Sequence, residues 1–111
     1  MKAAWFETFG EARDVLEVGH KDDPIVQDDE VLVDLRVSAV NPSDEKKRAG
    51  SFPDLLDDGF IIPHSDGAGI IVEVGKNISR NRIGERVWVY QGQFERRYGT
   101  AADLISIDSI R

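Results

Sequence analysis

The chain contains no cysteine and only one methionine. Without cysteine it can form no disulfide, no zinc site with thiolate ligands and no cysteine nucleophile. No apolar run approaches the roughly 20 residues that a membrane-spanning helix needs. Residues 1–5 are followed by Glu7 rather than by the apolar stretch of a signal peptide. We therefore predict a cytoplasmic protein without membrane contacts.

Positive charge is also scarce. Lys and Arg number 14 against 21 Asp and Glu, which gives a formal net charge of −7. A surface this acidic repels phosphate backbones and anionic lipids, which excludes nucleic acid and membrane headgroups as partners. The length of 111 residues suffices for one domain, and 41% hydrophobic residues suffice for a core.

Short strands dominate the periodicity of the sequence. Residues 30–40 alternate between apolar and polar side chains, which is typical of a half-buried strand. Their apolar side chains are predicted to share one face: Val31, Val33, Leu35, Val37 and Ala39. Further strand candidates are residues 2–7, 15–18, 67–74, 86–90 and 101–107. This pattern predicts a mainly β barrel or sandwich. The aromatic residues expected in its core or at an interface are Trp5, Phe6, Trp88 and Tyr90.

Residues 43–49 have the end signals of one short helix. Ser43 can cap its N-terminus, acidic residues come first, basic residues come last, and Gly50 follows. This charge order complements the helix macrodipole. The basic run Lys46-Lys47-Arg48 is either a solvated helix end or a cationic rim for a phosphate-bearing ligand.

Residues 66–72 nearly match the dinucleotide-binding pattern G-x-G-x-x-G. That pattern needs a third glycine and a following helix, whereas here Val72 takes the third position and a β-branched run surrounds it. We therefore interpret Gly67 and Gly69 as glycines that let a strand bend and pack closely against another backbone.

His64, Ser65 and Asp66 are consecutive polar residues at the start of the same strand. They either form hydrogen bonds with nearby backbone or belong to a substrate site, since polar loop residues serve both purposes. A zinc ion needs three or four ligands, and the only other histidine, His20, is far away in the sequence. We therefore expect no bound metal.

Five motifs follow one another in a fixed order: VSAVNPSD (37–44), RAG (48–50), PHSDGAG (63–69), VEVG (72–75) and IGERV (83–87). Together they resemble the N-terminal catalytic domain of the zinc-free quinone oxidoreductases, the zeta-crystallin-like branch of the medium-chain dehydrogenase/reductase superfamily. The resemblance covers about the whole chain. It implies that residues 1–111 form a GroES-like, partly open β-barrel with one or two short helices. In this family a Rossmann domain normally follows. Because the chain stops at Arg111, we expect that cofactor domain to be absent from it.

The resemblance also implies an activity, namely NADPH-dependent reduction of quinones or α,β-unsaturated carbonyl compounds by hydride transfer from the nicotinamide. No zinc would take part, since the positions of two zinc ligands in the alcohol dehydrogenases hold Asn41 and Ser65 here. Residues 1–111 would be the substrate-side domain of this enzyme and would be inactive alone. The resemblance also allows the full-length enzyme to be a homodimer. NADPH would be bound mainly by the missing domain.

The same resemblance assigns roles to residues at the end of the first long strand. Asn41 would be the catalytic residue, and Asn41, Pro42 and Lys46 would contact the cofactor, although the family often has tyrosine where this chain has Lys46. The substrate-binding residues would be His64, Ser65 and Asp66. The alternative is a stand-alone GroES-like interaction or binding module without catalytic activity.

Overall fold

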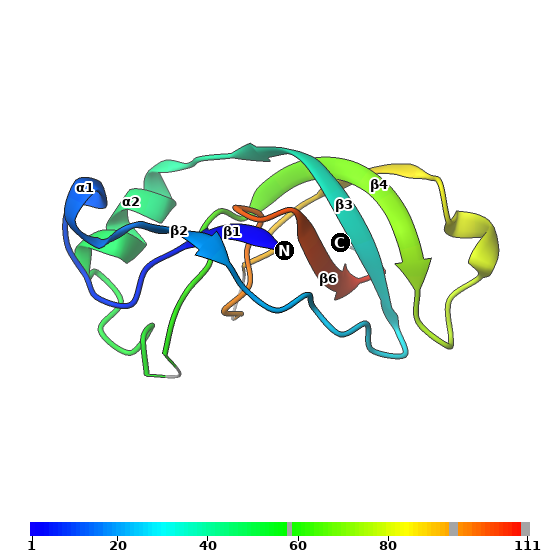
Figure 1. The fold of residues 1–111 in the computed structure, drawn as a ribbon, viewed down its shortest axis with the longest axis horizontal. Helices are drawn as coiled ribbons and strands as arrows, with labels where there is room; N and C mark the ends of the chain where they lie inside the picture. The colour runs from blue at the N-terminus through cyan, green and yellow to red at the C-terminus, as the bar shows by residue number, and fades with distance from the viewer. Residues whose placement is uncertain (58, 94–95, 110–111) are drawn as a thin grey trace.

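The computed structural model describes residues 1–57, 59–93 and 96–109 and shows a mainly β domain (Figure 1). Strands β1 (Lys2–Trp5) and β2 (Glu17–His20) form an antiparallel pair. A second antiparallel sheet has the order β5-β4-β3-β6, with β3 (Glu30–Ala39), β4 (Asp66–Val74), β5 (Arg86–Val89) and β6 (Leu104–Asp108). The helices are α1 (Ala12–Val15), α2 (Pro42–Ala49) and the 3-10 turn η1 (Arg80–Arg82).

The predicted fold class is confirmed: the domain is mainly β with two short α-helices, and its two sheets do not close into a barrel. Figure 1 shows that β3 and β4 form one long arch, with α1 and α2 at one end and η1 at the other. The register pairs Val31 with Val74 at one end of this arch and Ala39 with Asp66 at the other. The end of β3 and the start of β4 therefore lie side by side next to α2. Within the described ranges, no helix is long and apolar enough to cross a membrane.

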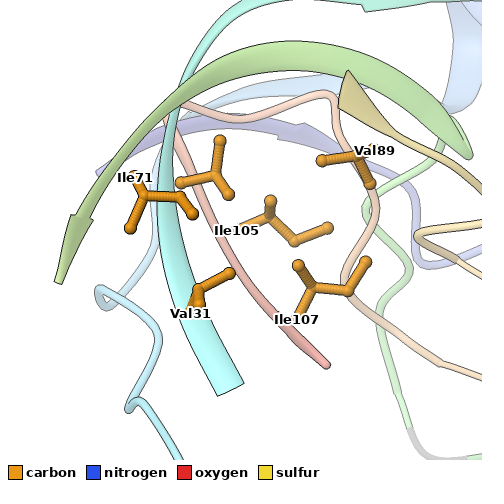
Figure 2. Packing of buried hydrophobic residues seen from close by; sticks show 6 residues of the cluster. Val31, Ile71, Val89, Ile105 and Ile107 are labelled. Atoms are coloured by element: carbon orange, nitrogen blue, oxygen red, sulfur yellow. The ribbon is translucent and has the colours of Figure 1, made fainter. Parts of the chain in front are cut away.

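All four strands of the larger sheet contribute residues to the hydrophobic core (Figure 2). Its buried residues are Val31, Val33, Ile71, Val89, Ile105 and Ile107. Each is 3% exposed or less, so this cluster supplies much of the hydrophobic stabilisation of the sheet.

Residues 30–39 form strand β3 as predicted, but burial does not alternate along it. Val31 and Val33 belong to the core, Leu32 between them is also buried, and Val37 is 61% exposed. The register with β4 shifts between Leu35 and Val37, so one extra residue of β3 is accommodated there. Such a bulge moves the following side chains to the opposite face of the strand. Val37 consequently points away from the core.

Gly67 and Gly69 both lie inside β4, and their interpretation as close-packing glycines is confirmed. A Cβ at Gly67 would lie 2.7 Å from the carbonyl oxygen of Val37, and a Cβ at Gly69 would overlap the carbonyl of Asp34. The two strands can approach this closely only because both positions lack a side chain.

Two predicted boundaries are wrong. Val15 ends α1 instead of starting a strand, because the N–H groups of Val15 and Leu16 bond to the carbonyls of Glu11 and Ala12 in a single helical turn. Helix α2 begins at Pro42, with Asn41 rather than Ser43 as its N-cap. Proline suits the first helical position, where no N–H donor is needed. Its predicted end at Gly50 is confirmed, with φ +102°.

Trp88 and Tyr90 are not in the core, one of the two places predicted for them. They are 81% and 62% exposed, whereas Phe6 is fully buried. In β5 the side chain of Val89 points into the core, so those of its two neighbours point to the opposite face. No described residue covers that face at Trp88.

The exposure of Trp88 leads to a stability prediction. Trp88→Ala should change the free energy of unfolding of the 111-residue chain by no more than about 0.5 kcal/mol, as is usual for surface substitutions. Ile105→Ala, at a position only 1% exposed, should cost about 3 kcal/mol and serves as the comparison. Urea unfolding followed by circular dichroism measures both values. A loss of several kcal/mol for Trp88→Ala would show that the outer face of β5 is covered.

Candidate functional site

The side chains of Asn41 and Asp66 meet where β3 ends and β4 begins. Asn41 Nδ2 donates a hydrogen bond of 2.8 Å to Asp66 Oδ2, and the backbone N–H of Gln91 lies 3.4 Å from Oδ1. The carboxylate of Asp66 therefore links the start of α2 with the chain that leaves β5. One N–H of the Asn41 amide is used in this contact, and its side-chain oxygen belongs to the capping box with the backbone of Asp44 at the start of α2. The second N–H remains for another partner.

The backbone of Asn41 is fixed from two sides. Its φ of −119° and ψ of 160° are extended, as the following proline requires. Its N–H donates to Asp44 Oδ2 at 2.7 Å, and Asp44 is only 3% exposed. Because an anchored backbone and a bound carboxylate both act on this residue, its amide has little freedom to turn.

His64 belongs to a separate chain of hydrogen bonds. His64 Nδ1 lies 2.8 Å from Ser38 Oγ, which lies 2.8 Å from Thr100 Oγ1. Thr100 uses its only proton to bond to the carbonyl of Asp66. Ser38 must therefore donate to Thr100, and His64 Nδ1 must carry a proton and donate to Ser38. Only Nε2 of His64 is left for a ligand. The backbone of His64 has φ +76°, a conformation uncommon for a residue other than glycine.

A groove of about 670 Å³ runs along the ends of β3 and β5 and the start of β4. Its lining residues are Val37, Ser38, Ala39, Asp66, Gly67, Ala68, Trp88, Val89 and Tyr90. Asp66 is the one charged residue among the described residues of this lining, and the exposed rings of Trp88 and Tyr90 contribute apolar surface. An apolar groove with few polar groups is the usual form of a small-molecule site.

The structure brings some of the predicted site residues together and leaves others apart. Asn41 and Asp66 are in contact, and Asp66 lines the groove. The other predicted site residues are not part of the groove lining: Asn41, Pro42, Lys46, His64 and Ser65. Lys46 is exposed on α2. The carbonyl of Ser65 accepts a hydrogen bond of 2.6 Å from Gly92.

Several residues of this region were not predicted as part of a site. Trp88 and Tyr90 were expected in the core or at an interface, and their alternation with the buried Val89 places them together on the opposite face. Ser38 and Thr100 carried no sequence signal, because their contact joins residues that are far apart in the chain.

Among the described residues, no group of three or more His, Asp or Glu side chains is arranged to hold a metal ion. A nicotinamide dinucleotide held by its pyrophosphate needs a glycine turn at a helix N-terminus. Gly67 and Gly69 do not fit that role, because they lie inside β4 and face the carbonyls of β3. The amide of Asn41, with its second N–H donor, does fit the polar nicotinamide end of such a cofactor.

Comparison with known proteins identifies the family. Residues 27–105 match the alcohol dehydrogenase GroES-like domain, and the chain belongs to this family of the medium-chain dehydrogenase/reductase superfamily. An alcohol dehydrogenase from Geobacillus stearothermophilus is 33% identical over 101 residues, which are 88% of this chain and 29% of that protein. The chloroplastic NADPH-dependent alkenal/one oxidoreductase of Arabidopsis thaliana is 28% identical over 89 residues, 77% of this chain and 23% of that protein.

Solved structures agree with this assignment. The quinone oxidoreductase from Coxiella burnetii superposes with a TM-score of 0.89 at 25% identity, covering 98% of this chain and 35% of that one. An alcohol dehydrogenase superfamily protein from Novosphingobium aromaticivorans gives a TM-score of 0.84 at 29% identity, covering 98% and 32%. The chain thus spans about a third or less of the length of these relatives. The GroES-like domain of the medium-chain dehydrogenase/reductase superfamily, predicted from the sequence motifs, is confirmed.

Proposed function

We propose that residues 1–111 form the substrate-side domain of an NADPH-dependent reductase of quinones or α,β-unsaturated carbonyl compounds that works without zinc. The Asn41–Asp66 pair carries this proposal. It sets a neutral, oriented amide at the end of β3, at the position where the zinc-dependent relatives are expected to have a metal ligand. The similarity to a quinone oxidoreductase and to an alkenal/one oxidoreductase supports the substrate class.

In this proposal the bound cofactor supplies a hydride to the electron-poor carbon of the substrate. Asn41 donates its second amide N–H to the oxygen on which negative charge develops, and a donor aligned in advance lowers the cost of that charge. Asp66 acts as a positioning residue, because it accepts the other N–H of the same amide. The apolar walls of the groove offer the substrate an apolar surface next to this pair.

The remaining predicted contacts belong to the same proposal. Lys46, exposed on α2, would contact the cofactor together with Pro42. His64 would present Nε2 to the substrate, since its Nδ1 is already bonded to Ser38. Ser65 would add its hydroxyl at the substrate side. The 111 residues alone would bind NADPH weakly, because no described residues form a cradle for its pyrophosphate.

The test uses the protein as its gene encodes it, after dialysis against a chelator. We expect it to oxidise NADPH with 2-cyclohexen-1-one or 1,4-benzoquinone above the enzyme-free rate, and we expect added zinc to leave turnover unchanged. Residues 1–111 alone should be inactive. Activity that depends on added zinc, or no NADPH oxidation with either substrate, would contradict the proposal.

One observation favours a second candidate, a binding module without catalysis. The groove is bordered by strongly exposed apolar side chains, and Trp88 alone is 81% exposed. A surface of this kind suits a protein or ligand partner whether or not a cofactor binds. The same NADPH assay separates the two candidates, because a binding module consumes no NADPH with any substrate.

A further inference from the structure

A second pocket, of about 660 Å³, lies beside α2 and shares no lining residue with the groove described above. Lys47 of α2 and Gln93 line it, together with apolar residues that include Phe52 and Leu55. None of the residues proposed for the reductase site belongs to this lining. The pocket therefore needs its own explanation.

Gln93 is the unusual residue of this pocket, because its polar side chain is only 2% exposed. Lys47 Nζ donates to Gln93 Oε1 at 3.2 Å. This contact fixes the orientation of the Gln93 amide. In the flipped orientation the amide NH₂ group would face the ammonium group of Lys47, and both are donors. Within the described part of the chain, Gln93 Nε2 then has no hydrogen-bond partner. A buried donor without an acceptor is costly, so an acceptor supplied by a ligand would be stabilised there.

The charge of the lining points to the kind of acceptor. Among the described residues, the lining has three basic side chains, Lys47, Arg96 and Arg97, and one acidic side chain, Asp54. Its sign is therefore opposite to the net charge of −7 of the whole chain. A positive recess in an acidic protein attracts and concentrates small anions. Lys47 differs in this respect from its exposed neighbour Lys46, because it is half-buried and turned toward Gln93.

Arg97 is held in place at the same pocket. Its Nε donates to the carbonyl of Phe60 at 3.2 Å, and its guanidinium carbon lies 4.3 Å from the centre of the Phe60 ring. A stacked guanidinium keeps its positive charge in a fixed position. The apolar part of the pocket wall consists of Phe52, Leu55 and Ile61.

We propose that this pocket binds a small carboxylate carried on an apolar body. The carboxylate accepts hydrogen bonds from Gln93 Nε2 and Lys47 Nζ, and the apolar body lies against Phe52 and Leu55. Two neighbouring donors, one of them charged, suit the two oxygens of a carboxylate. This proposal does not depend on the reductase proposal, because ligand binding to the pocket can be measured without any enzyme activity.

The test titrates three probes into the 111-residue chain: 3-phenylpropionate, its neutral counterpart 3-phenylpropan-1-ol, and phenyl phosphate. Calorimetry gives the affinities, and NMR follows the side-chain amide signal of Gln93. We expect 3-phenylpropionate to bind at least tenfold more tightly than the alcohol and to shift the Gln93 signal. Equal affinity for acid and alcohol, tighter binding of phenyl phosphate, or no binding at 10 mM would overturn the proposal.

Two variants locate the binding site. Gln93→Met removes the buried donor at nearly constant shape, and Lys47→Gln removes the charge; each should weaken 3-phenylpropionate binding at least tenfold. Lys76→Gln is the control, since Lys76 is exposed and outside the pocket, and it should bind as the parent does. If Gln93→Met does not fold, Lys47→Gln alone decides. Parental affinity in the folded pocket variants would overturn the assignment.

Discussion

Asn41→Ala is expected to lower the turnover number of the gene product at least tenfold, which corresponds to about 1.4 kcal/mol in the activation barrier. The substitution removes both the N–H donor proposed for the developing oxyanion and the amide that Asp66 positions. Asn41 is also the N-cap of α2 and forms a capping box with Asp44, so the substitution removes a helix cap as well, at a cost of about 1 kcal/mol in the free energy of unfolding. Urea unfolding must therefore show that the variant is folded under the assay conditions. Steady-state NADPH oxidation at saturating enone measures the effect.

The chain offers a matched control for this variant. Asn77 Nδ2 donates to Asp29 Oδ1 at 2.9 Å, so it forms the same kind of asparagine–aspartate pair in an exposed turn outside the groove lining. Asn77→Ala should therefore leave turnover unchanged while losing an equivalent hydrogen bond. If Asn41→Ala and Asn77→Ala both turn over as fast as the parent, the side chain of Asn41 is structural and the placement of the site is wrong.

Gly69→Ala should destabilise the 111-residue chain by about 3 kcal/mol, a large share of the stability of a small domain. The added methyl group would overlap the carbonyl of Asp34 in the neighbouring strand, and neither backbone can move without disturbing the pairing of β3 with β4. Urea denaturation followed by circular dichroism gives the change in the free energy of unfolding.

Gly84→Ala provides the comparison for that measurement. Gly84 has φ +94° but no atom within 4 Å of an added Cβ, so the substitution adds backbone strain without overlap. Its cost should be about 1 kcal/mol. An equal cost at the two positions, or parental stability of Gly69→Ala, would show that β3 and β4 are not packed this closely.

The parts of the fold that depend on local sequence were predictable. Helix α2 carries its own signals, because its acidic start, basic end and terminal Gly50 act within a few residues. Gly69 was assigned to a strand because β-branched residues follow it where a nucleotide-binding motif would continue as a helix. In both cases neighbouring residues determine the conformation.

The parts that depend on strand register were not predictable. A bulge near Arg36 reverses which side chains of β3 face the core, and no local pattern indicates its position. The Asn41–Asp66 contact exists because this register sets Ala39 opposite Asp66. The alternation of residues 86–90 shows that the side chain of Trp88 lies on the opposite face from that of Val89. It does not show which of the two faces is covered by the rest of the domain.

Direct hydride transfer tests the central claim most directly. The gene product, freed of metal by chelation, is incubated with 2-cyclohexen-1-one and NADPH that carries deuterium on the transferring face of C4, and the product is analysed by mass spectrometry and NMR. A reductase of the proposed kind yields cyclohexanone with one deuterium on the β-carbon, at a rate that zinc does not change. NADPH left unconsumed, or cyclohexanone formed without deuterium on that carbon, would contradict it.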